Sequence, residues 1–245
     1  MDDPHAWDDF APEYARVQRE SRLPVERDVT QALATQLPLR DWSVLDVAAG
    51  SGRYALPLAN ASARITLNDW SPAMLQEAKA WLDQHGVRNA AYQTGNWHEL
   101  PRRPLADLVF VSQLPTLTPK DLTHLRQLAG RAMAFNLQTA QTTALVTQMA
   151  TVLNTTPVPV PQADPARASR IQRALILKGI RVMHQDFTYT LSDTATVTEL
   201  LPAFDRAFSL SAARQLAAAV IGVPDPNLPV TTTISYTYSL LTCRL

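Results

Sequence analysis

The chain has 245 residues and is 46% hydrophobic, which is enough apolar material for one or two buried cores. Its 22 basic and 22 acidic residues balance, so no net charge points to a nucleic acid or to a membrane surface. The single cysteine, Cys243, excludes an intramolecular disulfide, and no apolar run reaches membrane-spanning length. Because no signal-peptide pattern is present either, the sequence predicts a soluble cytoplasmic protein.

Short apolar strands alternate with amphipathic helices in the first half of the chain. The strands are expected at residues 43–47, 63–67, 90–93, 105–111 and 132–137, and the helices at 7–20, 25–37, 53–60, 71–86 and 119–129. Ser71-Pro72 is a strong helix start, and Gly86 is the expected stop. Connections of this length allow right-handed crossovers, so the pattern predicts a doubly wound α/β sheet.

The pattern changes after residue 138. Helices are expected at 142–153 and, after a proline-rich stretch, at 166–178, where basic residues recur. Residues 182–191 and 230–241 alternate polar and apolar side chains, which is typical of antiparallel strands, with helices at 194–204 and 209–221 between them. The expected fold is a mostly parallel seven-stranded sheet with an antiparallel C-terminal strand.

A single domain over residues 1–245 accommodates all these elements. We expect a helical cap at 1–38, a ligand-binding core at 39–138, an insertion at 139–180 and sheet-completing strands and helices at 181–245. The proline-punctuated insertion is either a lid or a surface linker. A pocket for the second substrate is expected above the carboxyl ends of the strands. Its walls would come from the leading helices, the turn at 112–116 and the insertion.

Two of the seven glycines in the chain, Gly50 and Gly52, stand in the turn that follows the first predicted strand. A small-residue turn between a strand and a helix presents free backbone N–H groups at the positive end of the helix. Residues 50–55 also fit the dinucleotide pattern G-x-G-x-x-A, so NAD is one possible ligand.

Three side chains narrow the choice of nucleotide. Asp46 ends the first strand, where a carboxylate would repel a pyrophosphate and attract an ammonium group. Asp69 ends the second strand and can accept both hydroxyls of a ribose, which suits NAD equally well. Asn96 follows the third strand, where its amide could read an adenine edge. A ligand with an ammonium, a ribose and an adenine but no phosphate is S-adenosylmethionine.

With these features the chain resembles the class I, Rossmann-like, S-adenosylmethionine-dependent methyltransferases. VLDVAAGSGRYALPLA resembles their first motif, ITLNDWSPAMLQEAKAWL their second, TGNWHEL their adenine-reading turn and ADLVFVSQL their fourth motif. The leading helix also carries a similar pattern of Trp7 and Tyr14. The resemblance implies a cofactor site made by Asp46, Ala48, Gly50, Gly52, Asp69, Trp70, Asn96, Trp97, Ser112, Trp7 and Tyr14.

Two positions depart from the family pattern. Ala48 replaces the first glycine of the turn, and Asn96 replaces the more usual aspartate, although its carbonyl still accepts from the adenine amine. Neither change abolishes binding on physical grounds.

The resemblance implies in-line methyl transfer to an oxygen, nitrogen, carbon or sulfur nucleophile. This chemistry requires no dedicated base; His98 and Tyr14 are weak catalytic candidates. Ser112-Gln113-Leu114-Pro115 stands where many nucleic-acid base methyltransferases carry an Asn/Asp-Pro-Pro-aromatic run, so a small-molecule acceptor is favoured, with no nucleic acid, membrane or metal. A cofactor-binding protein without activity and an NAD-dependent oxidoreductase stay open as alternatives. The acceptor, the oligomeric state and the role of the basic helix at 166–178 do not follow from the sequence.

Overall fold

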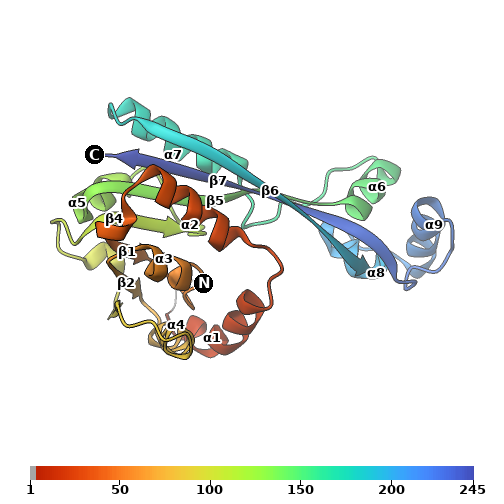
Figure 1. Ribbon diagram of the computed structural model, residues 1–245. Coiled ribbons are helices and arrows are strands. Elements are labelled where there is room, and N and C mark those ends of the chain that lie inside the picture. Colours follow the sequence, from red (N-terminus) through yellow and green to blue (C-terminus); the bar gives the residue numbers. More distant parts are fainter. Residues whose placement is uncertain (1–3) are drawn as a thin grey trace. The chain divides into compact units, whose positions relative to one another are not determined.

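A single seven-stranded sheet runs through the computed structural model, in the order β3-β2-β1-β4-β5-β7-β6 (Figure 1). The structure describes residues 4–245, so the first three residues of the expected helical cap lie outside it. The sheet confirms the predicted fold class. Its strands are β1 (Ser43–Val47), β2 (Arg64–Asp69), β3 (Ala90–Thr94), β4 (Ala106–Ser112), β5 (Ala129–Thr143), β6 (Val182–Ala195) and β7 (Val230–Arg244).

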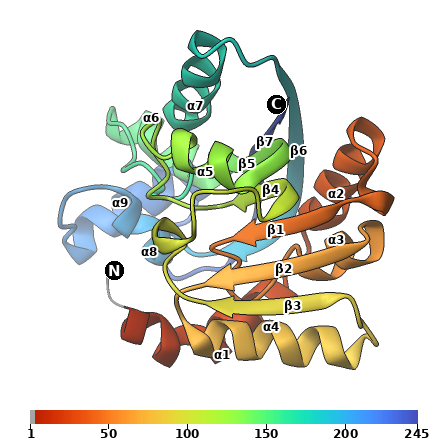
Figure 2. The same cartoon turned by 90° about the vertical axis from the view of Figure 1, so that its left-hand side faces the viewer.

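The strand order reverses direction between β1 and β4. From β1 the chain moves outward to β2 and β3, and it then returns to place β4 on the other side of β1. The β1–β2, β2–β3, β1–β4 and β4–β5 pairs are all parallel, and Figure 2 shows β1, β2 and β3 pointing the same way. The carboxyl ends of these strands therefore meet at one edge, and the reversal beside β1 is where open α/β sheets bind ligands.

The last two strands are antiparallel to each other. The backbone N–H of Leu245 donates to the carbonyl of Arg131 at 2.9 Å, and the Cys243 thiol donates to the carbonyl of Met133 at 3.3 Å, so β7 runs against β5. Hydroxyl contacts pair Thr188 with Thr237 and Thr190 with Ser235, so β6 runs against β7. The C-terminal strand is thus antiparallel, as the alternating pattern predicts.

The helices flank this sheet at positions close to those expected. Ser71 begins α4, because its Oγ accepts the N–H of Met74 at 3.1 Å and Pro72 occupies the first helical position; Gly86, with φ +70°, follows the end of the helix. The helices are α1 (Pro4–Arg19), α2 (Val25–Gln36), α3 (Ala55–Ala61), α4 (Pro72–Gln84), α5 (Leu122–Leu128), α6 (Ala144–Leu153), α7 (Pro165–Leu177), α8 (Val197–Leu200) and α9 (Leu210–Ile221).

Two boundaries differ from the prediction. The helix expected at 194–204 is wrong in extent, because residues 194–195 continue β6 and α8 is only four residues long. Thr196 and Glu199 form a capping box that fixes the late start, and a single 3-10 turn at Leu201–Ala203 follows. The strand expected at 132–137 extends in both directions as β5, because the polar run at 138–143 pairs instead of entering the next helix.

The chain folds into two compact units. The first comprises residues 1–137, 166–187 and 239–245, and the second comprises residues 138–165 and 188–238. In the first unit, α7 of the expected insertion buries Ala168, Ile171 and Leu175 in the core beside the sheet. In the second unit, α6, α8 and α9 pack around a smaller core that includes Met149 and Leu216. The boundaries proposed for a single domain, and the role of residues 139–180 as a lid, stay predictions.

Candidate functional site

The turn between β1 and α3 is held in a left-handed backbone conformation. Ala48, Gly50 and Gly52 have φ of +55°, +55° and +78°. A Cβ on Gly52 would stand 2.8 Å from the Cβ of Ala78 on α4, so glycine is required there for space as well as for conformation. Ala48 adopts the same sign of φ with a side chain, which shows that this departure from the family pattern does not prevent the turn from forming.

Asp69 ties this turn to the end of β2. Its Oδ2 accepts the N–H of Gly50 at 2.8 Å, and its Oδ1 accepts the N–H of Ser71 at 3.0 Å. The side chain is buried; burial raises its pKa, and the backbone donors oppose this shift. Since Ser71 supplies the side-chain cap of α4, Asp69 is not needed for that task. The backbone N–H of Trp70 also interacts with this carboxylate, and of its roughly four lone-pair positions one is left for a ligand hydroxyl.

Asp46 lies near the end of β1, one strand away from Asp69, and is 2% exposed. Among the residues that the structure describes, no hydrogen bond to its carboxylate and no basic partner is recorded. Burial, and to a lesser degree the negative charge of Asp69, raise its pKa to about 8. A buried carboxylate without a donor or a counter-charge is costly, so this position is suited to a ligand cation.

Helix α1 covers the glycine turn. The Tyr14 ring lies 3.7 Å from the point where a Cβ on Gly50 would stand, and burial raises the pKa of its hydroxyl. Trp7 packs edge-on against Tyr14, with ring centroids 5.9 Å apart. Asp8 fixes the helix to the start of α4, because its Oδ1 accepts the Ser71 hydroxyl at 2.5 Å; Figures 1 and 2 both show α1 beside α4. The structure thus brings Trp7 and Tyr14 to the turn.

The turn after β3 has a structural role of its own. The Oδ1 of Asn96 accepts the N–H of His98 at 3.1 Å and caps a 3-10 turn at Trp97–Glu99. The Trp97 ring is buried in the core of the first unit and stacks on His98 at 3.7 Å, whereas the His98 side chain is about half exposed. Trp70 follows Asp69 directly and is partly buried. The resemblance implies that Trp70 lies beside the ribose and that Asn96 and Trp97 flank the adenine, and these contacts stay predictions.

A hydrogen-bonded network that sequence reasoning missed lies at the ends of β4 and β5. The Nδ2 of Asn136 donates to the Tyr54 hydroxyl at 2.6 Å and to Ser112 Oγ at 3.1 Å. It links the predicted site residue Ser112 to Tyr54, which follows the glycine turn. The available signal was one asparagine in the otherwise apolar run AMAFNL, because such a residue needs a polar partner when buried.

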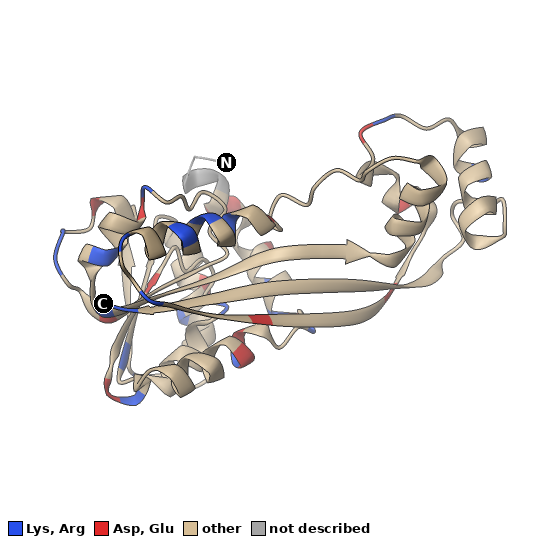
Figure 3. Cartoon of the chain, turned by 90° about the horizontal axis from the view of Figure 1, so that it is seen from above, with Lys and Arg blue, Asp and Glu red and all other residues tan. Residues whose placement is uncertain are grey.

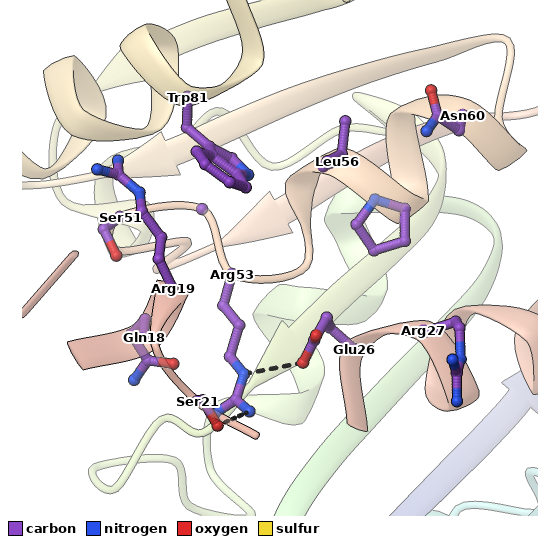
Figure 4. A pocket seen from close by; sticks show the side chains of 12 residues that line it. Gln18, Arg19, Ser21, Glu26, Arg27, Ser51, Arg53, Leu56, Asn60 and Trp81 are labelled. Carbon is purple, nitrogen blue, oxygen red and sulfur yellow. Dashed lines mark hydrogen bonds and ion pairs between the residues drawn. The ribbon is translucent and has the colours of Figure 1, made fainter. Parts of the chain in front are cut away.

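A cavity of about 300 Å³ adjoins the other side of the glycine turn (Figure 4). Its walls come from the end of α1, the start of α2, α3 and α4, and Arg53 crosses it to bond Glu26 at 3.2 Å and Ser21 at 3.1 Å. The guanidinium of Arg19 lies 5.1 Å from the centre of the Trp81 ring. Neither Asp46 nor Asp69 lines this cavity, so it is separate from the carboxylate site.

Residues 4–245 contain neither a candidate metal centre nor a candidate membrane span. No group of three or more His, Cys, Asp and Glu side chains in that range could hold a metal ion. None of the helices in the same range is both long enough and apolar enough to cross a membrane.

Comparison with known sequences identifies the segment that carries the site. Residues 44–136 match the family described as a methyltransferase domain. A protein-L-isoaspartate O-methyltransferase of Xanthobacter autotrophicus is 33% identical over 109 residues, which are 44% of this chain and 48% of that protein. An uncharacterised protein of Mycobacterium tuberculosis is 43% identical over 58 residues, which are 24% of this chain and 21% of that protein. The matches thus span about half or less of these relatives.

Solved structures share the fold at low sequence identity. Magnesium protoporphyrin IX methyltransferase (ChlM) of Synechocystis, solved with bound SAH, has a TM-score of 0.58 and 16% identity, with 99% of this chain and 100% of that chain covered. A SAM-dependent methyltransferase of Aquifex aeolicus has a TM-score of 0.53 and 14% identity, with 100% of both chains covered.

The sheet order, the glycine turn and the two strand-end carboxylates define a Rossmann-like α/β domain of the nucleotide-binding type. More narrowly, residues 44–136 match the methyltransferase-domain family, and the chain shares the α/β fold of the solved S-adenosylmethionine-dependent methyltransferases.

Proposed function

We propose that this chain binds S-adenosylmethionine at the Asp46–Asp69 site and transfers its methyl group to a small-molecule acceptor. The observation that carries the proposal is Asp46, a buried carboxylate with no recorded donor or cation among residues 4–245. The ammonium group of the cofactor supplies the missing positive charge. A dinucleotide would bring a pyrophosphate instead, whose negative charge would be repelled by Asp69 and would disfavour ionisation of Asp46.

The remaining contacts follow from the same edge of the sheet. Asp69 accepts from the ribose hydroxyls, with ligand hydroxyls competing with or adding to the backbone N–H groups of Gly50, Trp70 and Ser71. The left-handed turn at 48–52 lets the ligand approach the backbone closely, since Gly50 and Gly52 carry no side chain. The Tyr14 ring beside Gly50 offers an aromatic face to a cation and shields the site from water.

S-adenosylmethionine supplies a methyl group that a positively charged sulfur already activates. The task of the protein is therefore to hold the acceptor in line with that methyl group and to exclude water. Tyr14 is unsuited to act as a base near neutral pH, because burial raises the pKa of its hydroxyl and keeps it protonated. His98 stacks outside Trp97, and we assign no base to this chain.

A small-molecule acceptor is supported by the balanced charge of the chain and by Ser112-Gln113-Leu114-Pro115 in the fourth motif. Charged residues are also sparse on the strands and helices of the second unit (Figure 3), so that unit offers no basic surface for a nucleic acid.

The test compares ligands and then measures turnover. We expect S-adenosylmethionine and S-adenosylhomocysteine, at equal and saturating concentration, to raise the melting temperature, and NAD to leave it unchanged. Asp46→Asn should abolish the shift. Labelled S-adenosylmethionine should then transfer its methyl group to a member of a panel of neutral and anionic small molecules. Stabilisation by NAD alone would contradict the proposal. Tight cofactor binding without transfer to any acceptor would favour a binding protein.

A further inference from the structure

Residues 165–185 carry a local charge that the balanced charge of the whole chain hides. This stretch comprises helix α7, the turn that follows it and the start of β6. It contains no acidic residue, and the nearest acids, Asp164 and Asp186, stand just outside it. Figure 3 shows basic residues and no acidic residue along α7. The basic residues of the stretch are Arg167, Arg170, Arg173, Lys178 and Arg181. The segment is therefore strongly positive within a chain that has no net charge.

Three of these cations face solvent without a counter-charge. Leu175 packs in the core beside the sheet, and Arg173, two residues earlier, lies on the opposite side of α7. Arg173, Lys178 and Arg181 are exposed, and no ion pair is recorded for any of them among residues 4–245. Lys178 donates a hydrogen bond of 3.3 Å to the hydroxyl of Thr123, which is neutral. Their charges are therefore available to an anionic partner.

Two large apolar side chains stand among these cations. Ile176 is 56% exposed and Leu177 is 78% exposed, the highest value recorded for a large apolar side chain between residues 4 and 245. Single exposed apolar residues are ordinary, but two adjacent ones with unpaired cations on both sides call for an explanation. We refer to Arg173, Ile176, Leu177, Lys178 and Arg181 as the basic–apolar surface.

The end of α7 is well formed, so these side chains are not exposed by fraying. The backbone N–H of Gly179 donates to the carbonyl of Ile176 at 2.9 Å, and that of Ile180 donates to the carbonyl of Leu175 at 3.1 Å. The two bonds make a Schellman motif, and Gly179 has the positive φ, +74°, that this motif uses. Ile180 is buried in the same core as Leu175. The cap therefore holds Ile176 and Leu177 toward solvent.

The combination of cations and protruding apolar side chains indicates the kind of partner. A nucleic acid would pair with the cations but would gain nothing from Ile176 and Leu177. A second copy of the chain, docked through the same surface about a twofold axis, would bring like charges together. An anionic lipid surface suits both parts, because its headgroups attract cations and its acyl boundary takes up apolar side chains without a preformed pocket.

We propose that the basic–apolar surface binds the surface of an anionic lipid membrane. Ile176 and Leu177 enter the boundary between headgroups and acyl chains. The stems of the three cations lie along this boundary, and their charged ends reach the headgroup phosphates. The contact is reversible, because it depends on a few charges and two apolar side chains. None of these residues belongs to the site proposed for the cofactor, so the inference is independent of the proposed function.

The test measures co-sedimentation of the full chain with lipid vesicles. One set consists of phosphatidylcholine alone, and the other of phosphatidylcholine mixed with phosphatidylserine, which is anionic. We expect the protein to bind the mixed vesicles much more tightly than the neutral ones, and to be released from them as the salt concentration rises. Equal binding to both sets, or binding to neither, would overturn the inference.

Variants separate the two parts of the surface. Arg173→Gln should weaken binding to the mixed vesicles about fivefold, the effect of one cation near an anionic surface. Ile176→Gln with Leu177→Gln should weaken it about tenfold, because two apolar side chains no longer leave water. Arg103→Gln and Leu210→Gln are the matched controls, since both residues are exposed and lie elsewhere in the chain. The controls should bind the vesicles as the parent does.

Every variant should keep the melting temperature of the parent and its affinity for S-adenosylhomocysteine, because the altered side chains are exposed. Undiminished vesicle binding by Ile176→Gln with Leu177→Gln would overturn the inference, since the cations alone would then act as a general polyanion site. Tighter binding to a DNA duplex than to the mixed vesicles would also overturn it. So would a parent that is a dimer by light scattering and that this double variant converts to a monomer.

Discussion

The buried carboxyl group of Asp46 makes the stability of the ligand-free protein depend on pH. A carboxyl group in water has a pKa of about 3.9, whereas burial and Asp69 raise that of Asp46 to about 8. Between these two values the unfolded chain releases a proton that the folded, ligand-free protein keeps. The folded state is therefore progressively destabilised by Asp46 as the pH rises from about 4 to about 8. Such a group is retained for a purpose other than stability.

Replacing Asp46 should therefore stabilise the ligand-free protein. Asn resembles the protonated carboxyl group and never ionises, so Asp46→Asn removes the destabilisation. At a pH of about 8 we expect a gain of at least about 1.4 kcal/mol, the equivalent of one pKa unit, or roughly 3–6 °C in melting temperature. The gain should shrink toward a pH of about 5, and scanning calorimetry at both pH values measures it. A variant that is less stable than the parent at the higher pH would refute the assignment.

Asp69 should control affinity for the ribose hydroxyls. Loss of two charge-assisted hydrogen bonds in Asp69→Ala should weaken binding of S-adenosylhomocysteine by roughly 2–4 kcal/mol, since each is worth about 1.5–3 kcal/mol and water replaces part of it. Because Asp69 also accepts from Gly50 and Ser71, the melting temperature should fall as well. Titration calorimetry gives the affinity, and an unchanged value removes Asp69 from the site.

At the scale of elements, the contact between the glycine turn and α4 decides whether the turn can form. Gly52→Ala places a Cβ 2.8 Å from that of Ala78 and forces a side chain into a left-handed backbone. We expect a loss of about 1–3 kcal/mol in unfolding free energy, measured with urea.

The double variant Gly52→Ala with Ala78→Gly separates the two causes. It removes the clash and leaves the backbone strain, so the two changes should couple favourably by about 1 kcal/mol after allowance for glycine in a helix. Strict additivity would mean that the clash relaxes without cost. Gly86→Ala is the control for strain alone, because nothing lies within 4 Å of a Cβ at Gly86 and its φ is also positive.

Elements set by local signals could be predicted from the sequence. The Ser71 cap, the Gly86 stop and strands such as β1 depend on residues a few positions apart, and the structure has them where the pattern indicates. The extent of α8 could not be predicted from its helical spacing, because the pairing of residues 194–195 in β6 overrides helix propensity.

The candidate site also contains residues that the sequence indicates and contacts that it does not. Asp46, Asp69 and the two glycines could be found because strand ends and turns have sequence signatures. The bond between Asn136 and Tyr54 joins residues 82 positions apart, and a periodic pattern carries no information on such a pair. For Asn96 the sequence predicts an adenine contact, which stays a prediction, and the structure adds that its Oδ1 accepts the N–H of His98 and caps the next turn.

At the scale of the whole molecule, the two units have different compositions. The first holds the methyltransferase domain, the glycine turn, both carboxylates and helix α1, so every contact proposed for the cofactor lies within one compact unit. The second, with α6, α8, α9 and parts of three strands, contains few charged residues (Figure 3). The basic helix α7 buries an apolar face in the first unit, and a role for its arginines toward an anionic ligand stays a prediction.

The most direct test of the central claim, that Asp46 binds the ammonium group of the cofactor, is the number of protons released on binding. Titration calorimetry with S-adenosylhomocysteine at a pH of about 6.5, in two buffers of different ionisation enthalpy, measures it. At that pH the ligand amine is charged and Asp46 is protonated, so binding should release close to one proton, and affinity should rise toward a pH of about 8. Asp46→Asn should release none and bind far more weakly. Binding without proton release, or undiminished binding by Asp46→Asn, would contradict the account.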